Sequence, residues 1–246
     1  MKEDVYQPRT YRHWIDGEDL ASFQVTVKET DLYIRATTNL HKKAEKVVVK
    51  YRRQLEKYIE QNPVFQESLE PLPITKDAPR IVVMMMEAGE KAGVGPMAAV
   101  AGAVAECVGG EILEYSPEII VENGGDIYIK SLKKRVVGIF AGESPLSGKL
   151  GLEIDPKDTP LGICTSSGTV GHSLSYGKAD AVVAVAASAA LADAVATAIG
   201  NRVENTDDIA KAIEFGERIS DLKGLVIIKD DAVGVWGDLK LCQTSA

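Results

Sequence analysis

Residues 179–200 read ADAVVAVAASAALADAVATAIG, and this stretch decides the fold class. Its first part, 181–186, is short, continuous and apolar, which is typical of a buried strand, whereas the alanine-rich part, 188–199, is long enough for a helix. The whole run has the length of a membrane span, but it is mostly alanine and contains Asp180 and Asp193. It therefore predicts a buried strand followed by a helix.

Patterns elsewhere in the chain predict further strands and helices. Apolar residues alternate with polar ones over 23–27 and 32–36, as in an amphipathic hairpin, and they recur at helical spacing over 41–61. Strands are expected at 119–122, 126–130, 135–140, 150–154 and 162–165, helices at 81–91, 97–108 and 206–219, and a last apolar run lies at 225–228. Several strands are joined by short turns, which favours antiparallel pairing, and helices and strands are segregated along the chain.

These patterns predict an α+β fold with a mainly antiparallel sheet and packed helices. The proline-rich connector 62–79 shows no shift in composition that would mark a linker, so we expect a single domain over residues 1–246. The two helices at 97–108 and 188–199 consist mostly of small apolar residues without a charged face, and both are expected to be buried.

Composition and charge exclude several classes of function. The chain has 246 residues, 45% hydrophobic and 26% charged, as in a globular protein, and its net charge of -8 has the wrong sign for a nucleic-acid binder. Cys107, Cys164 and Cys242 are widely spaced and form no CxxC pair, so neither a disulfide framework nor a structural zinc site is indicated. The N-terminus carries Glu3 and Asp4 and lacks the apolar core of a secretory signal. We expect a cytoplasmic protein that binds neither nucleic acid nor membranes.

Four stretches rich in glycine or small residues are candidate ligand sites: AGVGPM (92–97), ENGGDIYI (122–129), CTSSGTVGHS (164–173) and ADAVATAIG (192–200). None is a Walker loop or a dinucleotide fingerprint. Asn123, Gly124, Gly125 and Asp126 are typical of a hairpin turn, because Asn-Gly tolerates a positive φ. Such a turn would also let a flat ligand or a phosphate approach the backbone, with Asp126 holding a polar group. Both interpretations stay open.

The stretch 164–173 offers hydroxyls and unhindered amides, with Ser166 and Ser167 beside Gly168. It has the components of an anion nest, and a solvated loop is the alternative. Cys164 could be a nucleophile, but no pair of a base and its orienting group accompanies it, so a buried core cysteine is favoured. His172 either contacts a ligand, as an acid or base, or is an ordinary surface histidine.

Asp193 and Thr197 lie four residues apart on the predicted helix and therefore share one face. A carboxylate among alanines is costly unless it is paired. A hard cation such as Mg²⁺ would pair with it, and so would a backbone group or an arginine. Spacing alone does not separate these alternatives.

Taken together, these motifs resemble the ApbE superfamily, whose characterised members are Mg²⁺-dependent FAD:protein FMN transferases. The resemblance rests on the order NGGD, TSSG, a histidine and ADAVATAIG over residues 122–200. Over the whole length the chain is more similar to a smaller ApbE-like family of archaea and anaerobic bacteria, through DLYIRATTNL, GVGPMAAVAGAVAE, VENGGDIYI and GICTSSGTVGHSLSYGKADAVVAV. This resemblance implies a T-fold-like arrangement of antiparallel sheet and helices.

The resemblance also implies roles for single residues. Asp193 and Thr197 would be the Mg²⁺ ligands, and His172 would be the catalytic histidine. The cleft for FAD or a related nucleotide would be lined by Gly95, Asn123, Gly124, Gly125, Asp126, Ser166, Ser167 and Gly168. The transferases have a DxGGxxKG stretch with a lysine, whereas this chain has AGVGPMAAVAG there, and no HxxDPxTG follows His172. The metal helix thus matches better than the catalytic residues.

Three hypotheses about function follow. The first is a protein that binds a flavin nucleotide with Mg²⁺ and transfers a nucleotidyl or FMN group to a hydroxyl of a protein acceptor. The second is a non-catalytic accessory or ligand-binding protein, and the third is an enzyme of anaerobic sulfur or amino-acid metabolism. A homo-oligomer is compatible with each of them. We further expect the loops 93–97, 123–126 and 166–172 to converge on one cleft, faced by Asp193 and Thr197.

Overall fold

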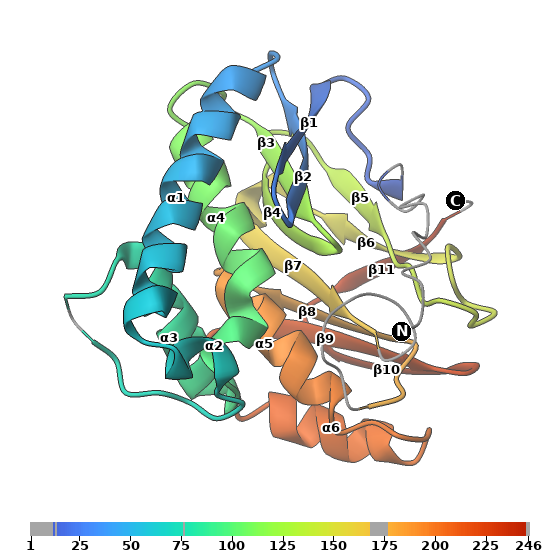
Figure 1. Ribbon diagram of the computed structural model, residues 1–246. Helices are drawn as coiled ribbons and strands as arrows, with labels where there is room; N and C mark the ends of the chain where they lie inside the picture. Colours follow the sequence, from blue (N-terminus) through green and yellow to red (C-terminus); the bar gives the residue numbers. More distant parts are fainter. Residues whose placement is uncertain (1–11, 13, 76, 168–176, 245–246) are drawn as a thin grey trace.

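The computed structural model describes residues 12, 14–75, 77–167 and 177–244 (Figure 1). Its strands are β1 (Ala21–Val27), β2 (Thr30–Ala36), β3 (Ile119–Asn123), β4 (Asp126–Lys130), β5 (Arg135–Gly138), β6 (Leu150–Ile154), β7 (Leu161–Ser166), β8 (Ala181–Ala186), β9 (Leu222–Lys229), β10 (Ala232–Gly237) and β11 (Lys240–Gln243). Its α-helices are α1 (His41–Gln61), α2 (Val64–Glu67), α3 (Arg80–Ala92), α4 (Val100–Ile112), α5 (Ala189–Gly200) and α6 (Asp208–Gly216), and short 3₁₀ helices cover Pro96–Ala99 and Pro156–Asp158.

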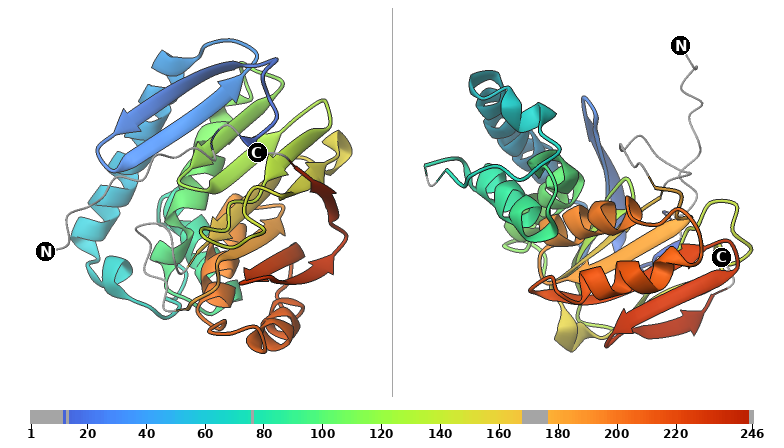
Figure 2. Two further views of the ribbon diagram at one scale, coloured as in Figure 1. Left: turned by 90° about the vertical axis from the view of Figure 1, so that its right-hand side faces the viewer. Right: turned by 90° about the horizontal axis from the view of Figure 1, so that it is seen from below.

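The strands form two sheets. The larger sheet has the order β1-β2-β3-β4-β7-β8-β9-β10, the smaller has the order β11-β6-β5, and all neighbouring strands are antiparallel. Figure 2 shows the β1–β2 hairpin and the β9–β10 hairpin at opposite ends of the larger sheet. The predicted α+β fold with a mainly antiparallel sheet is confirmed.

The two faces of the larger sheet have different partners. Helices α1, α3, α4 and α5 cover one face, and the smaller sheet lies against the other (Figure 1). Along β8, Val182 and Ala184 belong to the core under the helices, whereas Val183 and Val185 belong to the core between the two sheets. This alternation explains why β8 is apolar at every position, because both of its faces are covered.

Helix α5 is the most buried helix of the fold. Every one of its residues except Asp193 and Thr197 is buried. Its small side chains permit close contact with α4 and β7, where Gly102 and Gly162 face it. The predicted strand followed by a buried helix at 179–200 is thus confirmed.

Some boundaries differ from the sequence prediction. The helix expected from residue 97 begins as the 3₁₀ turn Pro96–Ala99 and continues as α4 to Ile112, and β5 ends at Gly138 instead of residue 140. Strands β10 and β11 were not predicted. Glycines weaken the strand pattern of β10, yet Gly234 is needed there because a Cβ atom would lie 2.3 Å from Cγ2 of Ile209.

Within the described ranges, no single helix is long and apolar enough to cross a membrane. Helix α3 and the segment Pro96–Ile112 satisfy length and composition only as a pair, bent by 106°.

Candidate active site

The site is organised by the turn between β3 and β4. Gly124 and Gly125 have φ angles of 69° and 107°, and Asn123 pairs with Asp126 across the hairpin. The hairpin-turn interpretation of this motif is therefore correct. A Cβ atom on Gly124 would meet nothing within 4 Å, so the turn also presents bare backbone to open space.

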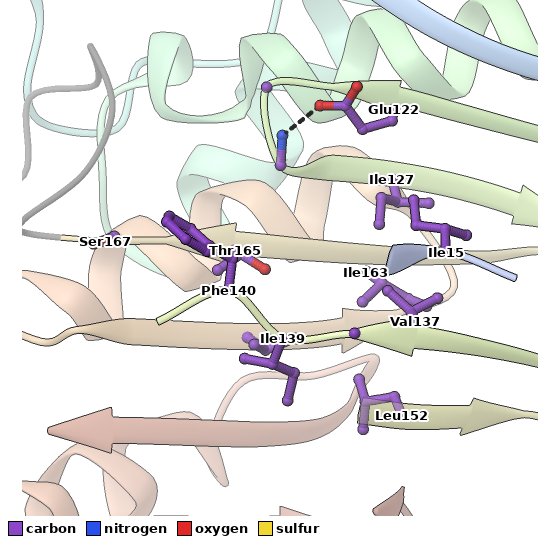
Figure 3. A pocket seen from close by; sticks show the side chains of 14 residues that line it. Ile15, Glu122, Ile127, Val137, Ile139, Phe140, Leu152, Ile163, Thr165 and Ser167 are labelled. Carbon is purple, nitrogen blue, oxygen red and sulfur yellow. Dashed lines mark hydrogen bonds between the residues drawn. The ribbon is translucent and has the colours of Figure 1, made fainter. Parts of the chain in front are cut away.

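Asn123 and Asp126 next to this turn point to one face of the sheet, and Glu122, one residue before Asn123, points to the other. Asn123 points toward the helices, where its side-chain amide donates to the carbonyl of Ala101 over 3.0 Å. Asp126, its partner across the hairpin, lies on this same face next to Asp193. Glu122 points the other way, into a pocket between the two sheets (Figure 3).

Asp126 and Asp193 are neighbouring carboxylates, of which Asp126 is buried and Asp193 half-buried. Asp126 is 8% exposed, and the Thr165 backbone and Cys164 lie close enough to its carboxylate to lower its pKa in part. Asp193 accepts from the backbone N–H groups of Ala101 and Gly102, the latter over 2.9 Å. Burial raises the pKa of both carboxyls, and the neighbouring Asp193 raises the pKa of Asp126 further. These surroundings therefore favour either a protonated carboxyl or a bound cation.

Cys164 lies beside this pair without being a nucleophile. It is fully buried, and its thiol contacts the carbonyl of Ala189 at 3.3 Å. Burial, together with Asp126 and Asp193, raises the pKa of the Cys164 thiol well above its usual value. A neutral buried thiol is a poor nucleophile, so the core-cysteine interpretation agrees with the structure.

Asp126 and Asp193 offer carboxylate oxygens, which are the kind of ligand that Mg²⁺ prefers. In the part of the chain that the structure describes, no lysine or arginine forms an ion pair with Asp126 or Asp193. Thr197 adds a half-buried hydroxyl one turn along α5. The same described residues hold no group of three or more His, Cys, Asp or Glu arranged for a metal. Mg²⁺ commonly completes such an open oxygen site with water and substrate phosphates.

The pocket on the opposite face lies between the two sheets and opens to solvent (Figure 3). The turn glycines Gly124 and Gly125, together with Thr165 and Ser167, line it on one side. The rest of its lining is mainly apolar: Ile15, Ile127, Val137, Ile139, Phe140, Leu152, Ile163 and Val183, with Gly138. A mainly apolar pocket with a few polar groups is the usual form of a small-molecule site.

Glu122 is held in this pocket by an ion pair that the sequence did not reveal. The Arg12 Nε donates to Glu122 over 2.6 Å, and the Gly125 N–H donates to the other carboxylate oxygen over 3.0 Å (Figure 3). Arg12 also binds the side chain and the carbonyl of Asp31. The two partners lie 110 positions apart, and no local pattern connects them.

The structure brings some of the predicted site residues together and separates others. Gly124, Gly125 and Ser167 line the pocket, whereas Asn123, Asp126 and Asp193 lie on the helix-covered face. Ser166 ends β7 and pairs with Val182. Gly168 and His172 lie outside the described residues.

Gly95 has a packing role in the structure. Its N–H donates to the carbonyl of Leu69 over 2.8 Å, and a Cβ atom there would lie 1.8 Å from the carbonyl oxygen of Ser68. The loop 93–97 thus packs on the connector after α2 and contributes no residue to the pocket lining. The expected convergence of all three loops on one cleft stays a prediction, because most of the third loop is not described.

The fold is similar to that of solved ApbE proteins. The flavin transferase ApbE of Vibrio cholerae superposes with a TM-score of 0.54 at 12% sequence identity, covering 88% of this chain and 96% of that one. The ApbE protein of Thermotoga maritima gives a TM-score of 0.58 at 12% identity, covering 87% and 96%. At such low identity the likeness shows the fold alone.

Sequence comparison gives the family. The model of the family described as "AbpE bacteria" matches residues 12–234, and the chain belongs to this family. The chain is also 43% identical over 227 residues to a UPF0280 protein of Methanococcus vannielii, covering 90% of this chain and 92% of that protein. The resemblance to an uncharacterised ApbE-like family is confirmed.

Proposed function

We propose that this protein binds FAD together with Mg²⁺ and transfers FMN to a hydroxyl of a protein acceptor, with AMP as the leaving group. The observation that carries the proposal is the neighbouring carboxylates of Asp126 and Asp193, which lack a cationic side chain among the described residues and have Thr197 one turn away on α5. Flavin transferases among the structural neighbours support the choice of ligand and reaction.

Each part of the site then has a role. Asp193 and Thr197 would hold Mg²⁺, with Asp126 as the neighbouring carboxylate. A bound Mg²⁺ neutralises charge on the pyrophosphate and on the leaving phosphate. At the Gly124–Gly125 turn the ligand could pass close to the backbone, because no side chain is in the way. The pocket between the sheets has mainly apolar walls, against which a planar ring could pack. His172 is proposed as the acid or base.

Isothermal titration calorimetry with FAD tests the binding step. Wild-type protein is expected to bind FAD more tightly with Mg²⁺ than with EDTA, and Asp193→Asn is expected to remove that difference. Release of AMP from FAD, followed by chromatography, tests the transfer chemistry. If FAD affinity does not depend on Mg²⁺ in the wild type, the metal role of Asp193 is wrong.

A non-catalytic ligand-binding protein is the second candidate, and one observation favours it. The stretch 92–102 carries no lysine, and its glycines Gly95 and Gly102 serve close packing against neighbouring backbone. Such a protein would bind FAD with Mg²⁺ and release no AMP. The AMP assay therefore separates the two candidates.

A further inference from the structure

The first turn of α5 is clamped between two glycines. A Cβ atom on Gly102 of α4 would lie 2.2 Å from the Ala189 carbonyl oxygen and 2.9 Å from the Asp193 Cβ. A Cβ atom on Gly162 of β7 would lie 2.2 Å from the Ala189 Cα. These backbone contacts set how closely α5 approaches α4 and β7. Glycine has no side chain that could form a hydrogen bond, so the contacts alone do not fix the orientation of α5.

Glu106 supplies directional bonds at the same point. It lies one turn beyond Gly102 on α4, and its Oε2 accepts from the Ser188 hydroxyl over 2.8 Å, the Ala189 N–H over 2.7 Å and the Ala190 N–H over 3.3 Å. The first N–H groups of a helix have no partner inside the helix, and an acidic group there is favoured by the helix dipole. The carboxylate of Glu106 therefore caps α5 from a neighbouring helix.

Contacts between α4 and α5 run in both directions. Glu106 of α4 accepts from the N-terminus of α5, and Asp193 of α5 accepts from the Gly102 N–H of α4. Asp193 lies one turn after the capped residues. A displacement of the cap would therefore move Asp193 and Thr197 together, because they are part of the same rigid helix.

We infer that Glu106 is a positioning residue. It fixes the position of α5 along its axis and the rotation of α5 about that axis, so that Asp193 and Thr197 can bind a metal–nucleotide ligand. This inference rests on the proposed function. Glu106 acts through α5 and is not assigned any contact with the ligand. Supporting residues of this kind typically change metal affinity by about 10-fold to 100-fold when they are removed.

The test measures FAD affinity by calorimetry, with Mg²⁺ and with EDTA, for wild type, Glu106→Ala and Glu106→Gln. Glu106→Ala is expected to lower the Mg²⁺-dependent affinity about 10-fold while the affinity in EDTA is unchanged. Glu106→Gln keeps an oxygen acceptor for the same N–H groups and is expected to stay close to wild type. A general loosening of the fold would lower both affinities, so the difference between them is diagnostic.

Glu111→Ala is the matched control. Glu111 lies on the same helix but binds Lys50 and Tyr51 of α1, at 2.5 and 2.7 Å, so its removal is expected to leave the Mg²⁺ effect unchanged. Should Glu106→Ala fail to fold, Glu106→Asp, which retracts the carboxylate by one methylene, takes its place with a smaller expected loss. A folded variant of either kind with the wild-type Mg²⁺ effect would overturn the positioning role. Absence of the Mg²⁺ effect in the wild type would instead overturn the proposed function.

Discussion

Two nearly buried carboxylates flank the glycine turn, and their surroundings are opposite. Glu122, before the turn, is 1% exposed and paired with Arg12, whereas Asp126, after it, is 8% exposed and lies beside a second carboxylate. Asp126 pairs with Asn123 across the hairpin and therefore shares its face of the sheet. Glu122 precedes Asn123 in the same strand, so its side chain points to the other face. The charge of Glu122 is compensated by a cationic side chain of the protein. The charge of Asp126 has no such partner among the described residues, so a proton or a bound cation is needed to compensate it.

The largest effect on stability is expected when the ion pair between Arg12 and Glu122 is broken. Arg12→Leu would remove the guanidinium that donates to the buried Glu122 carboxylate, which costs about 3 kcal/mol in the free energy of unfolding. Chemical denaturation measures this loss. The double variant Arg12→Leu, Glu122→Gln is expected to recover most of it, because the buried Glu122 charge is removed as well. A single-variant loss below about 1 kcal/mol would contradict the contrast between the two sides.

Removing a charge from the neighbouring carboxylates Asp126 and Asp193 is expected to affect stability much less. Asp193→Asn removes one of two like charges, so the stability of the metal-free protein should be unchanged or slightly higher. The Mg²⁺-dependent affinity for FAD should fall at least about 10-fold, because a ligand is lost. Denaturation without metal and calorimetry with metal check the two parts. A stability loss of several kcal/mol would show that Asp193 serves a structural hydrogen-bond network instead.

The pH dependence of stability sharpens the contrast. Since the pKa of Asp126 is raised in the folded protein, its neutral form is favoured, and the associated stability is fully present below the unfolded pKa of about 4. It is lost as the pH rises through the raised pKa, at about 1.4 kcal/mol for each unit of pKa shift.

Denaturation curves of the metal-free protein, recorded at several pH values from about 5 to about 8, measure this loss in the free energy of unfolding. Asp126→Asn should flatten the profile, and saturating Mg²⁺ should oppose the loss, because the cation favours the ionised carboxylates. Identical profiles for wild type and variant would argue against a titrating pair.

The smallest effect concerns the turn between the two carboxylates. Gly124→Ala should cost about 1 kcal/mol, because φ is 69° there, and Gly124→Asn should cost less, since asparagine tolerates this conformation. Both side chains would enter the open space above the turn and are expected to weaken FAD binding more than they weaken the fold. Thermal denaturation and calorimetry measure the two effects. Wild-type FAD affinity in Gly124→Asn would show that the ligand does not pass over the turn.

Local patterns were sufficient for most of the fold. The alternation of apolar residues, the apolar run of β8 and the small residues of α5 predicted the strands and the buried helix, because each pattern reflects a period of the backbone itself. Strand β10 escaped prediction, since Gly234 is required there by contact with α6, a distant element.

The site divides in the same way. The sequence by itself determined the NGGD turn and the shared face of Asp193 and Thr197, since both depend on residues a few positions apart. Only the tertiary structure decided that Asp126 lies near Asp193, that Arg12 pairs with Glu122 and that Glu106 caps α5. These contacts join residues far apart in the chain, where the charge and burial of a side chain depend on what the fold places beside it.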